Sequence, residues 1–101
     1  MLKRFATVEN FLENFTVDLL FEMNDEVLWH FFRKKVKKHL KKIADVKKVI
    51  VICDEYTNTP EVVDASAFRA DVYVLNRKNL FIRYNVIASD TGVLVNKFYA
   101  I

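Results

Sequence analysis

The sequence predicts an α+β domain in which two N-terminal helices pack on a small mixed or antiparallel β-sheet. Three observations predict it: helical periodicity up to about residue 43, period-two alternation after residue 68, and a composition that leaves little room for linkers. Glycine and proline occur once each, as Gly92 and Pro60, and 52% of the residues are hydrophobic. A chain of 101 residues has the length of one domain. We therefore expect residues 1–101 to form a single domain.

The first helix is expected over residues 2–20. The apolar residues recur at helical spacings with polar residues between them, at Phe5, Val8, Phe11, Leu12 and Phe15. Because β-branched residues at 16 and 17 weaken the helix preference, residues 16–21 could instead be extended.

A second helix is expected over residues 24–43. Asn24 suits the N-cap, and Asp25 and Glu26 place negative charge at the positive end of the helix dipole. One face carries the apolar side chains Leu28, Trp29, Phe32, Val36, Leu40 and Ile43. The other faces carry Arg33, Lys34, Lys37, Lys38, Lys41 and Lys42. The helix is therefore amphipathic and basic.

Strands are expected near residues 48–53, 68–75 and 80–88. The continuous β-branched run ending at Cys53 is typical of a central strand covered on both faces. Residues 54–60 are rich in turn formers, and Thr59 followed by Pro60 can start a short helix reaching about residue 65. Residues 68–74 and 80–86 alternate in polarity, so they predict half-buried strands that pair antiparallel across a loop at 76–79.

Charge is distributed unevenly along the chain. Residues 1–27 contain six acids and two bases, whereas residues 33–48 contain nine bases and the single acid Asp45. Lysines on a helix often only solvate an exposed face, but this excess also suits an acidic partner, whether nucleic acid, an anionic membrane or a protein. The basic face has no interleaved aromatic residue or glutamine, so nucleic-acid binding would depend on phosphates and on salt.

Several classes of protein are disfavoured by the sequence. The longest apolar run, residues 49–53, is far shorter than the roughly 20 residues needed to cross a bilayer. Glu9 and Glu13 interrupt any signal-peptide core, so a secreted protein is not indicated. Cys53 is the only cysteine, which excludes an internal disulfide and a cysteine-built zinc site. A reducing, cytosolic environment fits, and Cys53 is expected to be a small buried hydrophobic residue.

Candidate chemistry is sparse. His30 and His39 lie nine residues apart, which does not place two metal ligands on one helix face. Carboxylates near strand ends, as metal-dependent nucleases use them, occur at Asp54, Glu55, Glu61, Asp64 and Asp71. Carboxylates in turns more often cap backbone amides. We therefore interpret Asp54, Asn58, Thr59, Pro60 and Asp64 as a structural turn, and expect no enzymatic activity, cofactor or metal.

Two segments resemble a known family. Residues 21–29 read F-E-M-N-D-E-V-L-W, and residues 53–64 read C-D-E-Y-T-N-T-P-E-V-V-D. They are similar to the F-E-P-N-D-x-x-L-W and C-D-x-x-x-N-T-P-E-x-I-D segments of contractile-tail sheath proteins of bacteriophages and related injection machines, with Met23 replacing the usual proline. Residues 71–74 and 81–88 match the family's two following strands. The resemblance covers about residues 3–92.

The resemblance implies the C-terminal domain of a sheath subunit, which lies nearest the inner tail tube. The resemblance also implies that neighbouring subunits add terminal arms to an open sheet edge of this domain by β-augmentation. The implied partners are other copies or sheath subunits and an acidic tail tube that binds the basic helix, in a virion tail or in the bacterial cytoplasm during assembly. No membrane partner is expected. Family members are several hundred residues long, with outer domains inserted before this module. Because the sequence begins at Met1 just ahead of the module, the extended N-terminal arm is expected to be absent here.

The C-terminal segment follows a turn at Gly92. It carries the apolar side chains Val93, Leu94, Val95, Phe98, Tyr99 and Ile101. We expect residues 93–101 to add to a neighbour's sheet edge, the alternative being a fourth strand of the same sheet. The alternative function for the whole chain is a basic nucleic-acid-binding module or a small metal-dependent nuclease.

Overall fold

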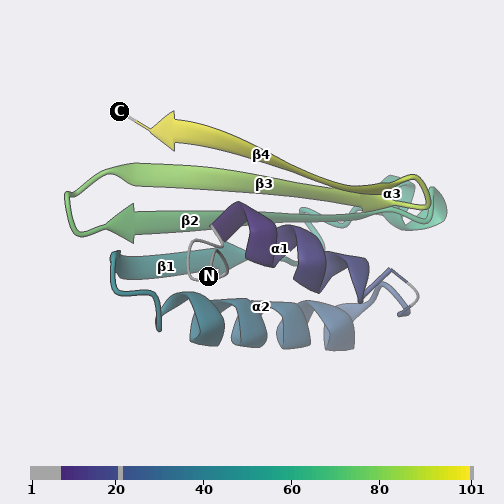
Figure 1. The fold of residues 1–101 in the computed structure, drawn as a ribbon. Coiled ribbons are helices and arrows are strands. Elements are labelled where there is room, and N and C mark those ends of the chain that lie inside the picture. The colour runs from purple at the N-terminus through teal and green to yellow at the C-terminus, as the bar shows by residue number, and fades with distance from the viewer. Residues whose placement is uncertain (1–7, 21, 101) are drawn as a thin grey trace.

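A computed structural model of the chain describes residues 8–20 and 22–100. In chain order the elements are α1 (Val8–Val17), α2 (Glu26–Leu40), β1 (Val46–Ile52), α3 (Pro60–Asp64), β2 (Phe68–Asn76), β3 (Phe81–Ser89) and β4 (Gly92–Ala100). The four strands form one antiparallel sheet in the order β1-β2-β3-β4. The helices α1 and α2 pack on one face of it, α1 against β3 and β4 and α2 against β1 (Figure 1). The predicted α+β class is confirmed.

The core lies between these helices and the sheet. Every second residue of β2 and β3 is buried, as the alternation in the sequence predicts. Phe32 of α2 is fully buried, with its ring 5.1 Å from that of Phe68 and 5.8 Å from that of Phe15. Leu12, Val36 and Leu40 are fully buried around it. The apolar stripe predicted for the second helix therefore faces the sheet.

The helices are shorter than predicted. Within the described part of the first segment, α1 ends at Val17 and a turn occupies residues 18–20. The second helix begins after Asp25, whose side-chain oxygen Oδ1 accepts hydrogen bonds from the backbone N–H groups of Val27 and Leu28. The prediction of Asn24 as the N-cap was wrong, because the Asn24 side chain bonds to distant residues instead.

The prediction of a central strand at residues 49–53 was also wrong. Within the described sheet β1 pairs with β2 alone and forms an edge. Its β-branched run has a different cause: Val49 and Val51 pack toward the helices, while Ile50 lies on the other sheet face opposite Tyr73 and is 40% exposed. A run that is apolar on both faces therefore does not require two strand neighbours.

The central hairpin is confirmed. β2 and β3 pair antiparallel from Phe68↔Ala88 to Leu75↔Phe81, and residues 77–80 form the loop. The Asn76 side-chain oxygen accepts from the N–H groups of Lys78 and Leu80, each at 2.9 Å, which places Leu80 in the loop rather than in the predicted strand.

The C-terminal segment adopts the alternative arrangement, a fourth strand. β4 pairs with β3 from Ser89↔Gly92 to Phe81↔Ala100. Gly92 has a φ of +128°, which an L side chain rarely adopts, so the tight turn at residues 90–91 needs a glycine there. Ile101 lies outside the described residues. Among the described residues, no helix is long and apolar enough to span a membrane.

Candidate interaction surfaces

The two segments that resemble sheath proteins meet in the structure. Asn24, from the first segment, donates through Nδ2 to the side-chain oxygen of Asn58, from the second, at 3.1 Å, and to the carbonyl oxygen of Ala67 at 2.7 Å. Its own side-chain oxygen accepts from the Trp29 indole N–H at 2.5 Å. Both segments therefore build one junction, which joins the start of α2 to the turn after β1 and to the start of β2.

Asn58 is the centre of this junction. Its side chain is buried and pairs with the backbone of Arg69 in both directions, donating to the carbonyl oxygen and accepting from the N–H, each at 2.9 Å. It also donates to the Sγ atom of Cys53 at 3.7 Å. Burial raises the pKa of the Cys53 thiol to about 12, so Cys53 is a protonated core residue, as the sequence predicts.

Of the predicted turn residues, Asp54, Asn58, Thr59 and Pro60 order the chain between β1 and α3, whereas Asp64 lies at the exposed end of α3. The Asp54 side chain accepts from the N–H groups of Tyr56 and Thr57 at 2.9 and 3.2 Å. Thr59 is the N-cap of α3 and Pro60 is its first residue. Glu55 and Asp64 are exposed.

The carboxylates weighed as metal ligands do not gather. No group of three or more His, Cys, Asp or Glu side chains that could hold a metal ion occurs within residues 8–20 and 22–100. The His39 ring stacks on that of Phe11, with centroids 3.8 Å apart, and His30 is exposed. Asp71 lies on the sheet face that the helices leave uncovered.

The lysines of α2 form an exposed basic face. It holds the predicted Lys34, Lys37 and Lys38, with Lys41 and Lys42 directly after the helix, and the fourth lysine of the helix, Lys35, is exposed as well. Arg33 does not belong to this face, contrary to the predicted set: it is half-buried and donates through Nη1 to the carbonyl oxygen of Cys53 at the end of β1. The reason is geometric, because Arg33 lies on the flank of α2 that is turned toward β1.

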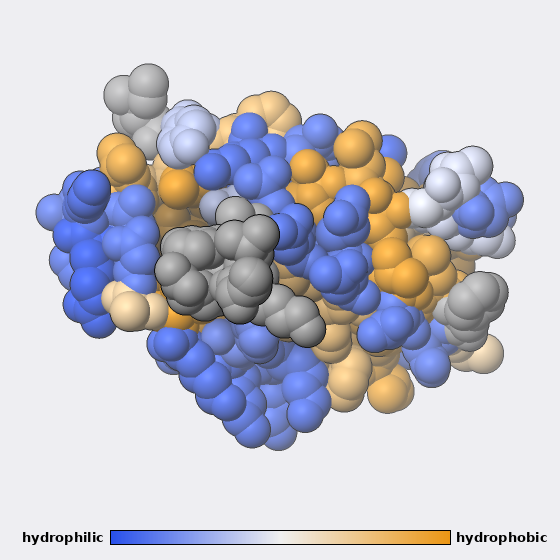
Figure 2. All heavy atoms as spheres, viewed as in Figure 1, coloured by the Kyte–Doolittle hydropathy of each residue, from blue (hydrophilic) through white to orange (hydrophobic). Residues whose placement is uncertain are grey.

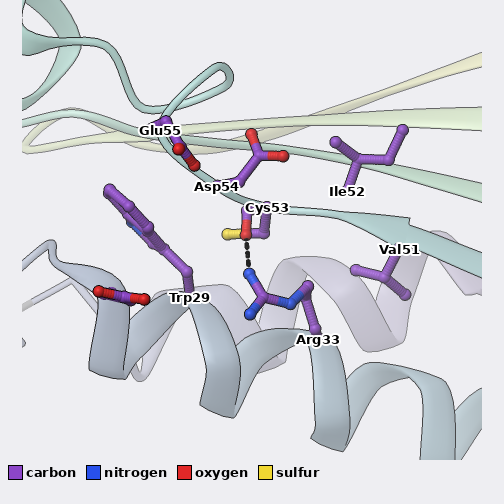
Figure 3. A pocket seen from close by; sticks show the side chains of 8 residues that line it. Trp29, Arg33, Val51, Ile52, Cys53, Asp54 and Glu55 are labelled. Carbon is purple, nitrogen blue, oxygen red and sulfur yellow. Dashed lines mark hydrogen bonds between the residues drawn. The ribbon is translucent and has the colours of Figure 1, made fainter.

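A pocket of about 490 Å³ lies between α2 and the end of β1. Figure 3 shows Arg33 reaching from the helix to the strand end, with Trp29 one turn earlier on the same helix. Acidic side chains from both elements line the pocket, namely Glu26, Asp54 and Glu55. Because Arg33 and Asp54 already bond to the backbone, they stabilise this end of β1.

β4 presents different side chains to its two faces. Val93 and Val95 pack against the core, whereas Leu94 and Phe98 are exposed, Phe98 at 51%. Lys97 lies 3.8 Å from the Glu9 carboxylate, and a hydrogen bond with Tyr99 is the main cause that raises the pKa of Lys97. Beyond β4, no further strand pairs with the described sheet, so its outer edge is open.

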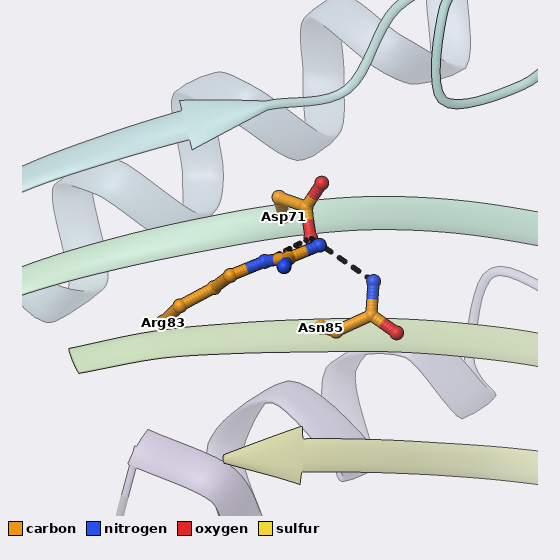
Figure 4. Close-up of polar contacts among 3 residues, drawn as sticks. All are labelled: Asp71, Arg83 and Asn85. Atoms are coloured by element: carbon orange, nitrogen blue, oxygen red, sulfur yellow. Dashed lines mark hydrogen bonds and ion pairs between the residues drawn. The ribbon is translucent and has the colours of Figure 1, made fainter. Parts of the chain in front are cut away.

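The uncovered sheet face holds a polar cluster that the sequence did not predict. One oxygen of Asp71 accepts from Arg83 Nε and Nη2 at 3.1 and 3.0 Å and from Asn85 Nδ2 at 3.0 Å (Figure 4). The Arg83 guanidinium also lies 5.7 Å from the centre of the Phe98 ring. The sequence places Asp71 and Arg83, which have opposite charges, on the polar sides of the two predicted hairpin strands. Predicting that they pair also requires the register between these strands.

Comparison with known proteins identifies two relatives. The chain is 37% identical over 76 residues to the tail sheath protein of Vibrio phage KVP40, and 31% identical over 77 residues to the tail sheath protein of Enterobacteria phage T4. The matches cover 71% and 72% of this chain but only 11% and 12% of the relatives' lengths. No family model matches the chain, and no solved structure matches it significantly. The resemblance to phage tail sheath proteins is confirmed.

Proposed function

The chain is a relative of the phage tail sheath proteins along most of its length, and on this premise we propose that it is a structural subunit of a contractile phage tail. The observation that carries the proposal is the 37% identity over 76 residues, supported by the hydrogen-bonded junction that joins the two sheath-like segments. The segment corresponds to the C-terminal domain of a sheath protein, and the working location is the virion tail.

Assembly uses the open edge of the sheet. A strand from a neighbouring subunit pairs along β4, whose unpaired backbone groups supply main-chain hydrogen bonds. Exposed apolar side chains at Leu94, Phe98 and Tyr99 give the incoming strand a surface to cover. Within the predicted exchange arm, residues 93–100 thus act as the acceptor while remaining paired with β3.

The basic face of α2 binds the tail tube. The exposed lysines at 34, 37, 38, 41 and 42 form many weak, salt-screened pairs with an acidic tube surface. Such pairs hold the subunit in register and release it during contraction. Arg33 takes no part, because it bonds to β1.

The test is particle association. Tail particles are purified from cells that make a tagged version of the chain, and the tag is followed through density-gradient sedimentation. We expect the tag to co-sediment with the tails and the free chain to bind DNA weakly at physiological salt. A tag found only in soluble fractions, together with tight salt-sensitive DNA binding, would support a basic nucleic-acid-binding module instead.

The tube contact has its own test. A Lys34→Glu/Lys38→Glu/Lys41→Glu variant should bind purified tail tubes at least about tenfold more weakly than the wild type at low salt, whereas single changes have little effect. Equal binding by the triple variant and the wild type would remove the tube contact from the proposal.

A further inference from the structure

The molecule has oppositely charged ends. The four strands and the helix α2 run roughly along one direction, so residues distant in sequence gather at each end of the described part of the chain (Figure 1). The end formed by the start of α2, by α3 and by the β3–β4 turn carries exposed acids at Asp18, Glu22, Glu26, Glu61, Asp64 and Asp90. The opposite end carries exposed bases at Lys41, Lys42, Lys47, Lys48, Arg77 and Lys78. Each end also holds an exposed residue of the other sign, Arg69 at the acidic end and Asp45 at the basic end, so the excess of one charge remains.

The acidic end contains an apolar groove of about 550 Å³ beside the α1–α2 turn. Leu19, Leu28 and Phe31 line it, and Val27, which is 77% exposed, stands at its rim. Glu22 and Asp25 add negative charge to the same lining. The groove therefore suits an apolar side chain with basic neighbours.

The basic end offers such a group in the β2–β3 loop. Leu80 is 49% exposed and follows Arg77 and Lys78. Hydrogen bonds fix the loop: Arg77 donates through Nε to the carbonyl oxygen of Ala44 at 2.7 Å, and Lys47 donates to the Asn79 side chain at 3.2 Å. Because the loop is ordered before it binds, little conformational entropy is lost on docking.

We propose that the acidic groove binds the basic β2–β3 loop of a second copy, with Leu80 as the apolar anchor. Both ends take part and each contacts the opposite end of a neighbour, so the contact is heterologous and generates a ring or a helical filament. The proposal rests on the proposed function as a self-assembling tail subunit. It adds an end-to-end contact between copies, called the axial contact below, to the side-by-side strand addition along β4.

A charge-swap experiment tests the contact on the purified chain. Glu22→Lys/Glu26→Lys reverses two charges beside the groove at the acidic end, and Lys48→Glu/Lys78→Glu reverses two charges at and beside the loop of the basic end. Sedimentation velocity at low salt should show concentration-dependent association of the wild type, an at least about tenfold weaker association of each variant alone, and recovered association when the two variants are mixed.

Matched controls separate this contact from the others. Lys34→Glu/Lys37→Glu changes the net charge as Lys48→Glu/Lys78→Glu does, but in the second half of α2, outside both the groove and the loop, and should leave the association between copies unchanged. Leu80→Asp and Val27→Asp should each weaken it. A wild type that stays monomeric at low salt, or a variant mixture that fails to associate, would overturn the proposal.

Failure of this contact can be told apart from failure of the proposed function. If Phe98→Asp abolishes association while the charge variants associate normally, the axial contact is wrong and strand addition along β4 stands. If the axial contact is observed but the tagged chain never sediments with tails, the proposed function fails and the contact between copies remains.

Discussion

The two edges of the β-sheet differ in how the chain treats them. At β1, the helix α2 runs alongside the strand, and Arg33 donates to the Cys53 carbonyl oxygen at the strand end (Figures 1 and 3). At β4, no described element lies beyond the strand, and Leu94, Phe98 and Tyr99 are exposed. Exposed edges promote unwanted pairing, so proteins usually cover them. The chain therefore places α2 beside one edge and leaves the other without a described neighbour, and the proposed strand addition uses the second.

Surface hydropathy fits this difference. Figure 2, which views the molecule from the same side as Figure 1, shows hydrophilic residues over the later part of α2 and a mixture of hydrophobic and hydrophilic residues elsewhere. The exposed lysines suit the later part of α2 to solvent and to charged partners, whereas the exposed Leu94, Phe98 and Tyr99 suit β4 to apolar contact.

The largest effect is expected at the closed edge, from Asn58→Ala. The change leaves the backbone N–H and carbonyl of Arg69 and the Asn24 side chain without their buried partner. We expect the free energy of unfolding to fall by about 3 kcal/mol or more in chemical denaturation. Asn85→Ala, on the uncovered sheet face, serves as the control and should cost about 1 kcal/mol or less. Equal losses would mean that the junction does not secure this edge.

Arg33→Ala tests the closure of β1 itself. It removes a charged donor from the Cys53 carbonyl oxygen, so stability should fall by about 2 kcal/mol. Backbone amides near the end of β1 should also exchange hydrogen faster. Lys34→Ala, at the exposed neighbouring position, should change stability by less than about 0.5 kcal/mol. Unchanged exchange at β1 in Arg33→Ala would contradict the account of this edge.

The buried thiol gives a pH test of the same region. The folded-state pKa of Cys53, about 12, lies above its ordinary value of 9.0, so the unfolded chain loses its proton first as pH rises. Wild-type stability should therefore decline between pH 9 and pH 12, by up to about 1.4 kcal/mol per pH unit relative to Cys53→Ala. Parallel stability curves for the two proteins would show that the thiol is not buried.

The smallest effect on stability is expected at the open edge, from Phe98→Asp. The side chain is exposed, so the unfolding free energy should change by less than about 0.5 kcal/mol. Incorporation into tails, followed by sedimentation, should nevertheless be lost, because the strand-adding surface becomes charged. Tyr56→Asp, at another exposed aromatic residue, should incorporate normally. Normal incorporation of Phe98→Asp would place assembly elsewhere on the molecule.

The elements of the sheet were predictable from the sequence where one face is buried and the other is wet. The alternation of apolar and polar residues in β2 and β3 identified both strands and their hairpin, because a period of two indicates a strand with one buried face. β1 was misplaced in the sheet, because a run such as Val49–Ile50–Val51 does not distinguish a strand neighbour from a helix on one face.

The junction and the edges were harder to predict, because they depend on distant partners. Asn24 and Asp25 are equally good caps by local rules, and Asn58, 34 residues away, decides between them. Arg33 looked like its lysine neighbours until the position of β1 was known. The pairing of Asp71 with Arg83 likewise required the strand register.

The most direct test of the central claim, that this chain is a tail subunit that assembles through its open edge, is cryo-electron microscopy of tail particles from the organism that encodes it. The account predicts density for the domain in the tail, with a neighbour's strand paired along β4 and the β1 edge still beside α2. Tails that contain the domain with nothing paired along β4, or tails that lack the domain, would contradict it.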